Sequence, residues 1–308
     1  MIEDILDFVL TAPPEAPAAA DLEAWWSERV RVAGSWETPV DAAIARALGA
    51  DRIGYAFAPG YHAALRTLVP ALPDNELVAF CATEQGGAHP RAIRTSLIEG
   101  ELTGEKRWST FATAATNLLV VASLGLDADG RNRLCVVRVS ARAPGVVLRR
   151  MPETPFAPEI PHAEASFQAV RVAADDVLAG DGYTEYLRPF RTIEDAHVHA
   201  VLIAYLISVA RRSSWPRAVL ERLAAALVTA RALALAPPSR PVVHVALAGL
   251  VESTNALLAE SAEHWKLVEP AESERWQRDA PLGTVAARAR GARLESAWQK
   301  LATSHVQR

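Results

Sequence analysis

Two short stretches of the chain carry residues that are better suited to holding a ligand than to packing. Thr83 ends an apolar run, and the loop Gly86-Gly87-Ala88 that follows it has almost no side chains. Further along the chain, Trp108 precedes the hydroxyl residues Ser109 and Thr110. A bare loop can present its main-chain N–H groups to an anion, and an indole combines an apolar ring with a polar edge. The two stretches therefore indicate a binding site.

The elements that must position these residues are strands. From Glu76 to about Val172 the apolar residues alternate with polar ones or form β-branched runs, which is typical of strands. The runs cover residues 76–83, 92–110, 117–125, 132–141, 145–150 and 165–172. Glycines at Glu99-Gly100 and Thr103-Gly104, and the segment 127–132, supply turns. We predict antiparallel strands that form a β-barrel or sandwich.

Helical spacing of apolar residues dominates on both sides of this region. The sequence predicts an α+β fold in three parts: a small N-terminal helical region over residues 1–75, the β-subdomain over 76–183, and a C-terminal four-helix bundle over 184–308. A Pro/Ala connector at residues 11–20 interrupts the first region. The four bundle helices are expected at residues 193–212, 217–236, 242–268 and 272–303.

Composition excludes several classes of protein. The formal net charge of −4 leaves no excess of positive charge for nucleic acid or an anionic membrane. The N-terminus lacks the features of a signal peptide. The apolar segment 198–210 is shorter than the roughly 20 residues of a membrane span, and we predict that it is a buried core helix. Cys81 and Cys135 lie in apolar runs, where buried, reduced thiols are expected. We expect a cytoplasmic protein with no nucleic-acid or membrane partner.

The order of helices, strands and helices, taken with these motifs, resembles the acyl-CoA dehydrogenase family of flavoproteins. In that family a strand ends in Thr-Glu before a small-residue loop, as at Thr83-Glu84, and a later strand carries Trp with a hydroxyl residue two positions on, as at Trp108 and Thr110. The stretches GELTGEKRWST and FQAVRVAADDVLAGDGY are similar to the hairpin and closing strand of the family's middle domain. The resemblance covers about residues 76–183, and outside them it rests on architecture.

The resemblance implies FAD as the cofactor. Thr83 and Thr110 would bond the edge and N5 of the flavin ring, Trp108 would cover one face, and the main chain of the loop would meet the pyrophosphate. The cofactor-binding residues that the resemblance implies are Phe80, Ala82, Thr83, Gly87, Ala88, Trp108 and Thr110. Each of them alone is also typical of a loop, a strand edge or a core, but the ordered set favours the flavin.

The resemblance also implies an enzyme of fatty acid metabolism that dehydrogenates an acyl-CoA or similar acyl thioester, with a hydride passing to flavin N5. A carboxylate must then remove the α-proton. Its usual place, a few residues after Arg278-Asp279-Ala280, reads Ala286-Ala287-Arg288 here. Some members use the start of the first bundle helix, so Glu194 is the candidate base, with Asp195 behind it. Alternatively, Thr192 is an N-cap and both acids favour the helix dipole.

Two departures from the family pattern keep a second function open. First, His89-Pro90 stands where the family's loop usually continues Gly-Ser-Asp. Second, the family's arginine-aromatic-glycine motif, which binds the adenosine half of FAD, has its nearest counterpart here in residues 211–216. The alternative is a catalytically inactive member acting as a structural or regulatory subunit. A homodimer or a hetero-oligomer with a paralogue fits either function.

The remaining polar residues give weaker signals. His197 and His199 are two positions apart and so point to different faces of a helix, and no metal site is expected. Glu84 is interpreted as structural. Four basic residues could meet coenzyme A phosphates or simply form a solvated face: Arg91, Arg94, Lys106 and Arg107.

Overall fold

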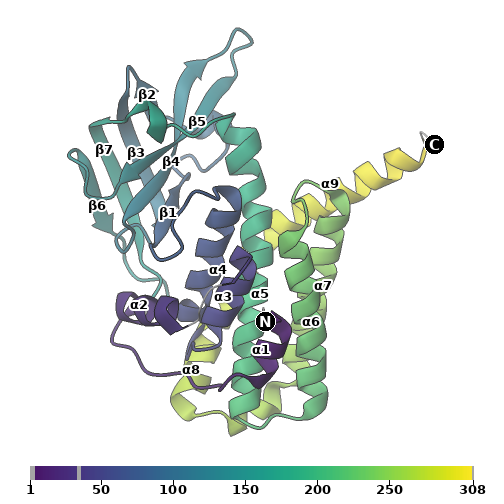
Figure 1. Cartoon of the computed structure of the whole chain (residues 1–308). Coiled ribbons are helices and arrows are strands. Elements are labelled where there is room, and N and C mark those ends of the chain that lie inside the picture. The colour runs from purple at the N-terminus through teal and green to yellow at the C-terminus, as the bar shows by residue number, and fades with distance from the viewer. Residues whose placement is uncertain (1–3, 33–35, 307–308) are drawn as a thin grey trace. The chain divides into compact units, whose positions relative to one another are not determined.

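The computed structural model describes residues 4–32 and 36–306 (Figure 1). The chain divides into two compact units. Unit 1 holds Met1–Thr67, Pro155–Ala157 and Thr192–Arg308, and unit 2 holds Leu68–Thr154 and Pro158–Arg191. The ends of the chain and residues 33–35, which fall in the predicted helical regions, lie outside the described residues.

Unit 2 contains a seven-stranded sheet with the order β1-β4-β2-β3-β7-β6, in which β5 also pairs with β4. The strands are β1 (Val78–Cys81), β2 (Ser96–Ile98), β3 (Glu101–Thr110), β4 (Asn117–Leu126), β5 (Asn132–Ser140), β6 (Val146–Arg150) and β7 (His162–Arg171). Each predicted run holds at least part of a strand, so the β-rich middle of the chain is confirmed.

The sheet is mixed, and the prediction that all its strands are antiparallel is wrong. β1 pairs with β4 in parallel from Val78↔Asn117 onward, and β2 meets β4 in parallel at Ser96↔Ser123. After β1 the chain passes through a long loop, β2 and β3 before it enters β4. This segment is the crossover connection that a parallel pair of strands requires. The alternation of residues within a single strand does not show whether its neighbour runs parallel or antiparallel.

The core of unit 2 consists of the inward-facing side chains of these strands. Leu118, Val137 and Phe167 are almost completely buried in one cluster. Cys81 and Cys135 belong to the same cluster and are free, which confirms the predicted buried thiols. Burial raises the pKa of both thiols to about 11, so thiolates are rare at neutral pH.

Unit 1 is helical. Most of its residues lie in α1 (Ile5–Thr11), α2 (Leu22–Val32), α3 (Pro39–Ala47), α4 (Ile53–Leu68), α5 (Arg188–Arg212), α6 (Arg217–Leu235), α7 (Pro241–Glu260), α8 (Pro270–Asp279) and α9 (Ala287–Val306). The predicted single helix over 272–303 is wrong, because a 3-10 turn at Ala280–Thr284 separates α8 from α9. Pro281 lies in that turn and cannot donate a helical hydrogen bond. The predicted helix over 242–268 likewise ends at Glu260.

Within residues 4–32 and 36–306, two helices are long and apolar enough to cross a membrane by length and composition. The first runs from Gly182 to Arg212, and 89% of its apolar window is buried within the protein. The prediction that the segment 198–210 is a core helix is thereby confirmed. The second is α7, and 28% of its apolar window is buried within the protein.

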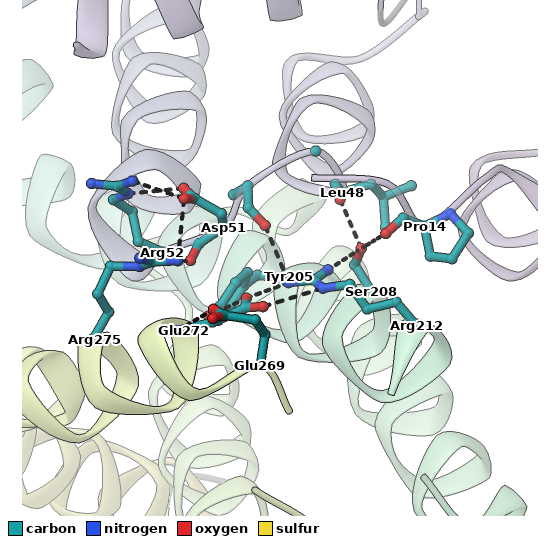
Figure 2. Close-up of polar contacts among 12 residues, drawn as sticks. Pro14, Leu48, Asp51, Arg52, Tyr205, Ser208, Arg212, Glu269, Glu272 and Arg275 are labelled. Carbon is teal, nitrogen blue, oxygen red and sulfur yellow. Dashed lines mark hydrogen bonds and ion pairs between the residues drawn. The ribbon is translucent and has the colours of Figure 1, made fainter. Parts of the chain in front are cut away.

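A buried polar network joins α5 to α8 and to the N-terminal helices (Figure 2). Arg212 forms an ion pair with Glu272, and the Tyr205 hydroxyl donates to the same carboxylate over 3.0 Å. Ser208 donates to the carbonyl of Leu48 over 2.7 Å. Burial and the charge of Glu272 raise the pKa of Tyr205 well above its usual value. Because each polar group has its partner, the network fixes the register of α5.

Gly104 provides a test of the packing in unit 2. Its φ is +145°, and a Cβ at this position would lie 2.5 Å from the Cα of Thr95. We expect Gly104→Ala to lower the free energy of unfolding by about 2–4 kcal/mol, because backbone strain adds to overpacking. Denaturant unfolding measures the change.

Gly130→Ala is the matched control, since Gly130 also has a positive φ of +74° but no atom within 4 Å of the added Cβ. It should cost only about 1 kcal/mol, the strain alone. Equal losses in the two variants would contradict the packing argument.

Candidate functional site

The structure brings together the two stretches that the sequence marks as a binding site. The main-chain N–H of Arg107 donates to the carbonyl of Thr83 over 2.9 Å. The loop after β1 therefore lies beside the end of β3, where Trp108 and Thr110 are found.

The loop after β1 is a tight turn with an open main chain. Glu84 and Gly87 exchange two hydrogen bonds, of 3.1 and 2.9 Å, between their N–H and C=O groups. Gly87 has a φ of +97°, and a Cβ there would meet no atom within 4 Å. Ala88 follows and is half-buried. This segment has the bare backbone that binding to a phosphate requires.

His89 has a structural role in the turn that follows. Its Nδ1 accepts the N–H of Arg91 over 3.2 Å and so caps the 3-10 turn Pro90–Ala92. The departure from the family loop at His89-Pro90 therefore organises the next turn of this chain.

Trp108 is presented to solvent by an irregularity in β3. Its φ is +59°, in the left-handed region, and the register between β3 and β7 shifts between Lys106 and Ser109. Such bulges re-aim a side chain out of the regular alternation. The indole is 51% exposed, and its nearest aromatic neighbour is His162, at 6.2 Å between ring centroids. Positive φ in a bulky residue is uncommon and costs free energy, and such strain concentrates at functional sites.

The predicted cofactor-binding residues divide into an exposed and a buried group. Thr83 and Thr110 are half-buried, and neither hydroxyl has a hydrogen bond with any residue that the structure describes. Phe80 and Ala82 are buried, with Phe80 packed on Phe190 at 4.7 Å between ring centroids. An exposed indole beside two hydroxyls suits a planar ring with a polar edge, and the buried pair supports the strand behind it.

An ion pair that the sequence did not reveal holds this site. The Nζ of Lys106 lies 2.7 Å from Oε1 of Glu84, and the lysine side chain is completely buried. The Glu84 carboxylate also accepts the N–H groups of Arg94 and Thr95, over 2.7 and 3.0 Å. The interpretation of Lys106 as part of a solvated face is therefore wrong. It pairs with buried Ala165 across β3 and β7, so alternation places it on the inner face.

Burial and pairing act in opposite directions on these two groups. Burial alone would raise the pKa of Glu84, but Lys106 and the two main-chain N–H groups outweigh it and lower that pKa. Burial lowers the pKa of Lys106, and Glu84 offsets part of the effect. Glu84 is thus a structural carboxylate whose charge is matched inside the protein.

The candidate base Glu194 and its neighbour Asp195 lie on α5 in unit 1. α5 begins at Arg188 and continues from a π-helical segment, Gly182–Leu187. Thr192 is therefore inside the helix, and its interpretation as an N-cap is wrong. Glu194 and Asp195 do not lie in the first turn of the helix, which is further upstream, so the prediction that they favour the helix dipole there is also wrong. Glu194 is half-buried.

Asp195 is held by two arginines of α9. Nη1 of Arg290 lies 3.2 Å from one carboxylate oxygen, and Arg293 forms an ion pair with the other. Asp195 is 8% exposed, and both arginines are largely buried. It therefore holds this part of α5 against α9.

The two histidines of α5 are also engaged within the chain. His197 donates from Nδ1 to the carbonyl of Ile193 over 2.8 Å, and its Nε2 lies 3.0 Å from the Thr67 hydroxyl. Burial lowers the pKa of His197 to about 4. Across residues 4–32 and 36–306, no group of His, Cys, Asp and Glu side chains gathers as metal ligands.

The segment nearest to the family's adenosine-binding motif serves packing in this chain. Arg211 donates from Nη1 to the carbonyls of Val9 and Ala12, over 2.9 and 2.7 Å. Arg212 is paired with Glu272. Both guanidinium groups therefore hold helices of unit 1 together.

Replacing Lys106 tests the ion pair. We expect Lys106→Met to lower the free energy of unfolding by about 3–5 kcal/mol at pH 7, since it leaves a buried carboxylate without its cation. Arg171→Met is the control, because Arg171 pairs with Glu101 at an exposed position and should cost less than about 1 kcal/mol.

The pH dependence of this loss has a definite sign. In the wild type the pKa of Glu84 is lowered, so its stabilisation is complete above the ordinary carboxyl pKa and disappears as pH falls through the lowered value. In the variant the unpaired carboxylate should have a raised pKa, so protonation relieves it on acidification. The difference in unfolding free energy between the two proteins should shrink from pH 7 to pH 4. A constant difference would contradict the assignment.

The fold is similar to those of several solved structures, acyl-CoA dehydrogenases among them. Butyryl-CoA dehydrogenase from Megasphaera elsdenii has 15% sequence identity and a TM-score of 0.66, over 97% of this chain and 99% of that chain. A structure of PigA with FAD and proline has 13% identity and a TM-score of 0.67, over 97% and 95% of the two chains. The prolyl acyl carrier protein oxidase AnaB has 15% identity and a TM-score of 0.64, over 95% and 96%. No protein-family model and no curated protein sequence matches the chain. From its N-terminal helices through the mixed sheet to the C-terminal helices, the chain has the fold of the acyl-CoA dehydrogenases.

Proposed function

We propose that the protein is a flavin-dependent oxidoreductase that binds FAD and catalyses the α,β-dehydrogenation of an acyl thioester. The observation that carries the proposal is an exposed indole at Trp108 together with the hydroxyls of Thr83 and Thr110, which make no hydrogen bond with the described residues, beside a loop of small residues.

These residues fit the cofactor in chemistry as well as in order. Trp108 would cover one face of the ring, and Thr83 and Thr110 would hydrogen-bond its edge. The main-chain N–H of Ala88 would meet the pyrophosphate, because the N–H of Gly87 already donates to the carbonyl of Glu84 and Gly87 adds no side chain in the way. Two of the similar solved structures, both of PigA, are described with FAD, which supports this choice of cofactor.

The same fold supports the proposed substrate class. Butyryl-CoA dehydrogenase and the prolyl acyl carrier protein oxidase are named for thioester-linked substrates. When bound, FAD would supply the acceptor for the β-hydride. Glu194 would remove the α-proton, since it is a half-buried carboxylate on a mostly apolar helix. Asp195, through Arg290 and Arg293, would hold this part of α5 in position.

The alternative function is a catalytically inactive subunit with the same fold. It is favoured by the absence of a carboxylate at Ala286-Ala287-Arg288 and by the engagement of Arg211 within unit 1. The two functions differ in whether the purified protein binds FAD and whether a thioester bleaches the flavin absorption.

We also propose that the protein is cytoplasmic, and that it acts without a metal ion, a nucleic-acid partner or a membrane. We further propose that it assembles as a homodimer or as a hetero-oligomer with a paralogue. Assembly is supported by exposed aliphatic side chains on α6 and α7, namely Val228, Leu235 and Val242.

Removing the indole tests the cofactor site. We expect Trp108→Ala to weaken FAD binding about tenfold or more, since stacking of an aromatic side chain on a planar ring contributes about 1–3 kcal/mol. Trp298→Ala is the matched control, because Trp298 is 54% exposed and lies on α9. Quenching of flavin fluorescence on titration measures both. An equal effect of the two substitutions, or none, would argue against the site.

Removing the candidate base tests the reaction. Glu194→Gln should slow the reduction of bound flavin by an acyl thioester about 10²–10⁴-fold, the usual contribution of a positioned base. Its affinity for FAD should stay unchanged. Glu221→Gln, which alters an exposed carboxylate on α6, should leave the rate as it is. Stopped-flow absorbance gives the rate, and full activity in Glu194→Gln would exclude this residue as the base.

A further inference from the structure

An open cleft of about 460 Å³ lies over the outer face of β3, β7 and β6. The strand register determines which residues line the cleft, because residues opposite one another on neighbouring strands share a face of the sheet. Glu105 lies opposite Ser166, which lies opposite Val147, and Glu164 lies opposite Arg149. The remaining lining residues are Gln85, Lys106, Arg107 and Ala165.

One carboxylate in the cleft is shared by two guanidinium groups. Nη2 of Arg149 lies 2.8 Å from Oε2 of Glu164, and Nη2 of Arg107 lies 3.3 Å from Oε1. Lys106 contributes no further charge, since its ammonium group is turned inward to Glu84. Glu105 lines the cleft in the neighbouring row, opposite Ser166.

The guanidinium group of Arg107 has only some of its hydrogen bonds satisfied. Its Nε is buried and has no hydrogen-bond partner among the residues that the structure describes. The planar guanidinium can make two parallel hydrogen bonds to an anion, but here it approaches Glu164 through one terminal nitrogen at the longer distance. An unsatisfied buried donor carries a free-energy cost that a better-placed acceptor would remove.

These features match a phosphate better than other small ligands. Guanidinium groups bind phosphate oxygens in a forked geometry, and Gln85 and Ser166 add neutral hydrogen-bonding groups. Val147 is 52% exposed and provides an apolar wall for a chain attached to the phosphate. The volume lies within the range of small-molecule sites, roughly 300–1,000 Å³.

The cleft also adjoins the proposed cofactor residues along the chain. Gln85 follows Glu84 in the turn after β1, and Arg107 directly precedes Trp108. The main-chain hydrogen bond from Arg107 to Thr83 joins the two segments. A ligand in the cleft would therefore lie against the same loop and strand as the proposed flavin-binding residues.

We propose that this cleft binds the phosphate of a phosphopantetheine chain, the group on which coenzyme A and carrier proteins both present acyl thioesters. Arg107 and Arg149 hold the phosphate, and Glu164 is the internal carboxylate that the phosphate displaces. The identity of the ligand rests on the proposed function, whereas the anion site rests on the cleft itself.

The test is a calorimetric titration with 4′-phosphopantetheine, in which two substitutions act in opposite directions. Arg149→Gln should weaken binding about tenfold, the effect of losing a hydrogen bond to a charged group. Glu164→Gln should strengthen binding severalfold, because it removes the competing charge. Both side chains are partly exposed, Arg149 at 79% and Glu164 at 34%, so the fold should tolerate the changes, and circular dichroism checks this.

The exposed ion pair between Arg171 and Glu101 supplies matched controls on the same sheet. Arg171→Gln and Glu101→Gln alter the net charge by the same amounts and should leave the affinity unchanged. If they act as strongly as the cleft variants, or if Glu164→Gln fails to strengthen binding, the anion site is overturned.

Further arms identify the source of the phosphate. Coenzyme A and a serine peptide carrying phosphopantetheine as a phosphodiester are compared, and the tighter ligand identifies free cofactor or carrier protein as the source. Inorganic phosphate binding as tightly as phosphopantetheine would overturn the ligand class. FAD binding is measured on the same samples: its loss would count against the proposed function, whereas intact FAD binding without phosphopantetheine binding would count against this inference.

Discussion

The site in unit 2 depends on one buried ion pair. Lys106 and Glu84 come from β3 and from the turn after β1, and the same carboxylate holds the main chain of Arg94 and Thr95 just before β2. A buried charge is tolerated only when all its partners are in place, so three segments distant in sequence are bound to one arrangement. Gly87 follows Glu84 by three residues, and the outward-turned Trp108 follows Lys106 by two, so both are close to this pair in the chain.

The sequence predicted the elements of unit 2 well and their pairing poorly. The strands were recognisable because each has its own alternation of buried and exposed residues, which is local information. Whether β1 and β4 run parallel depends on the path of the chain between them. Lys106 illustrates the same limit: its charge indicated solvent, and only the register of β3 against β7 places it inside.

In the helical region the errors had local causes. Pro281 is a sequence signal for the end of α8, whereas the early start of α5 through a π-helical segment has no clear sequence signal. That early start removed the capping role assigned to Thr192. The roles of the candidate site residues and the three-part division at residues 75 and 183 stay predictions. The partners of Asp195 could not be predicted, because Arg290 and Arg293 are distant in sequence.

The charged residues at the start of α9 take part in packing, near the place where the resemblance to the acyl-CoA dehydrogenases led us to expect a base. Arg290 and Arg293 follow the Ala286-Ala287-Arg288 segment and hold α5 through Asp195. Carboxylate and guanidinium groups here thus set the position of α5, on which Glu194 is carried. A change in this segment would act on the proposed base through the helix that bears it.

The two cysteines have a practical consequence for labelling experiments. Both are buried in the sheet core, and their pKa values of about 11 suppress the thiolate, the form that reacts with maleimides and other electrophiles. Since the chain has only these two cysteines, a third placed on an exposed helix would accept a fluorescent or spin label selectively, without removal of the native pair. The wild-type core thereby provides a background suited to spectroscopic labelling.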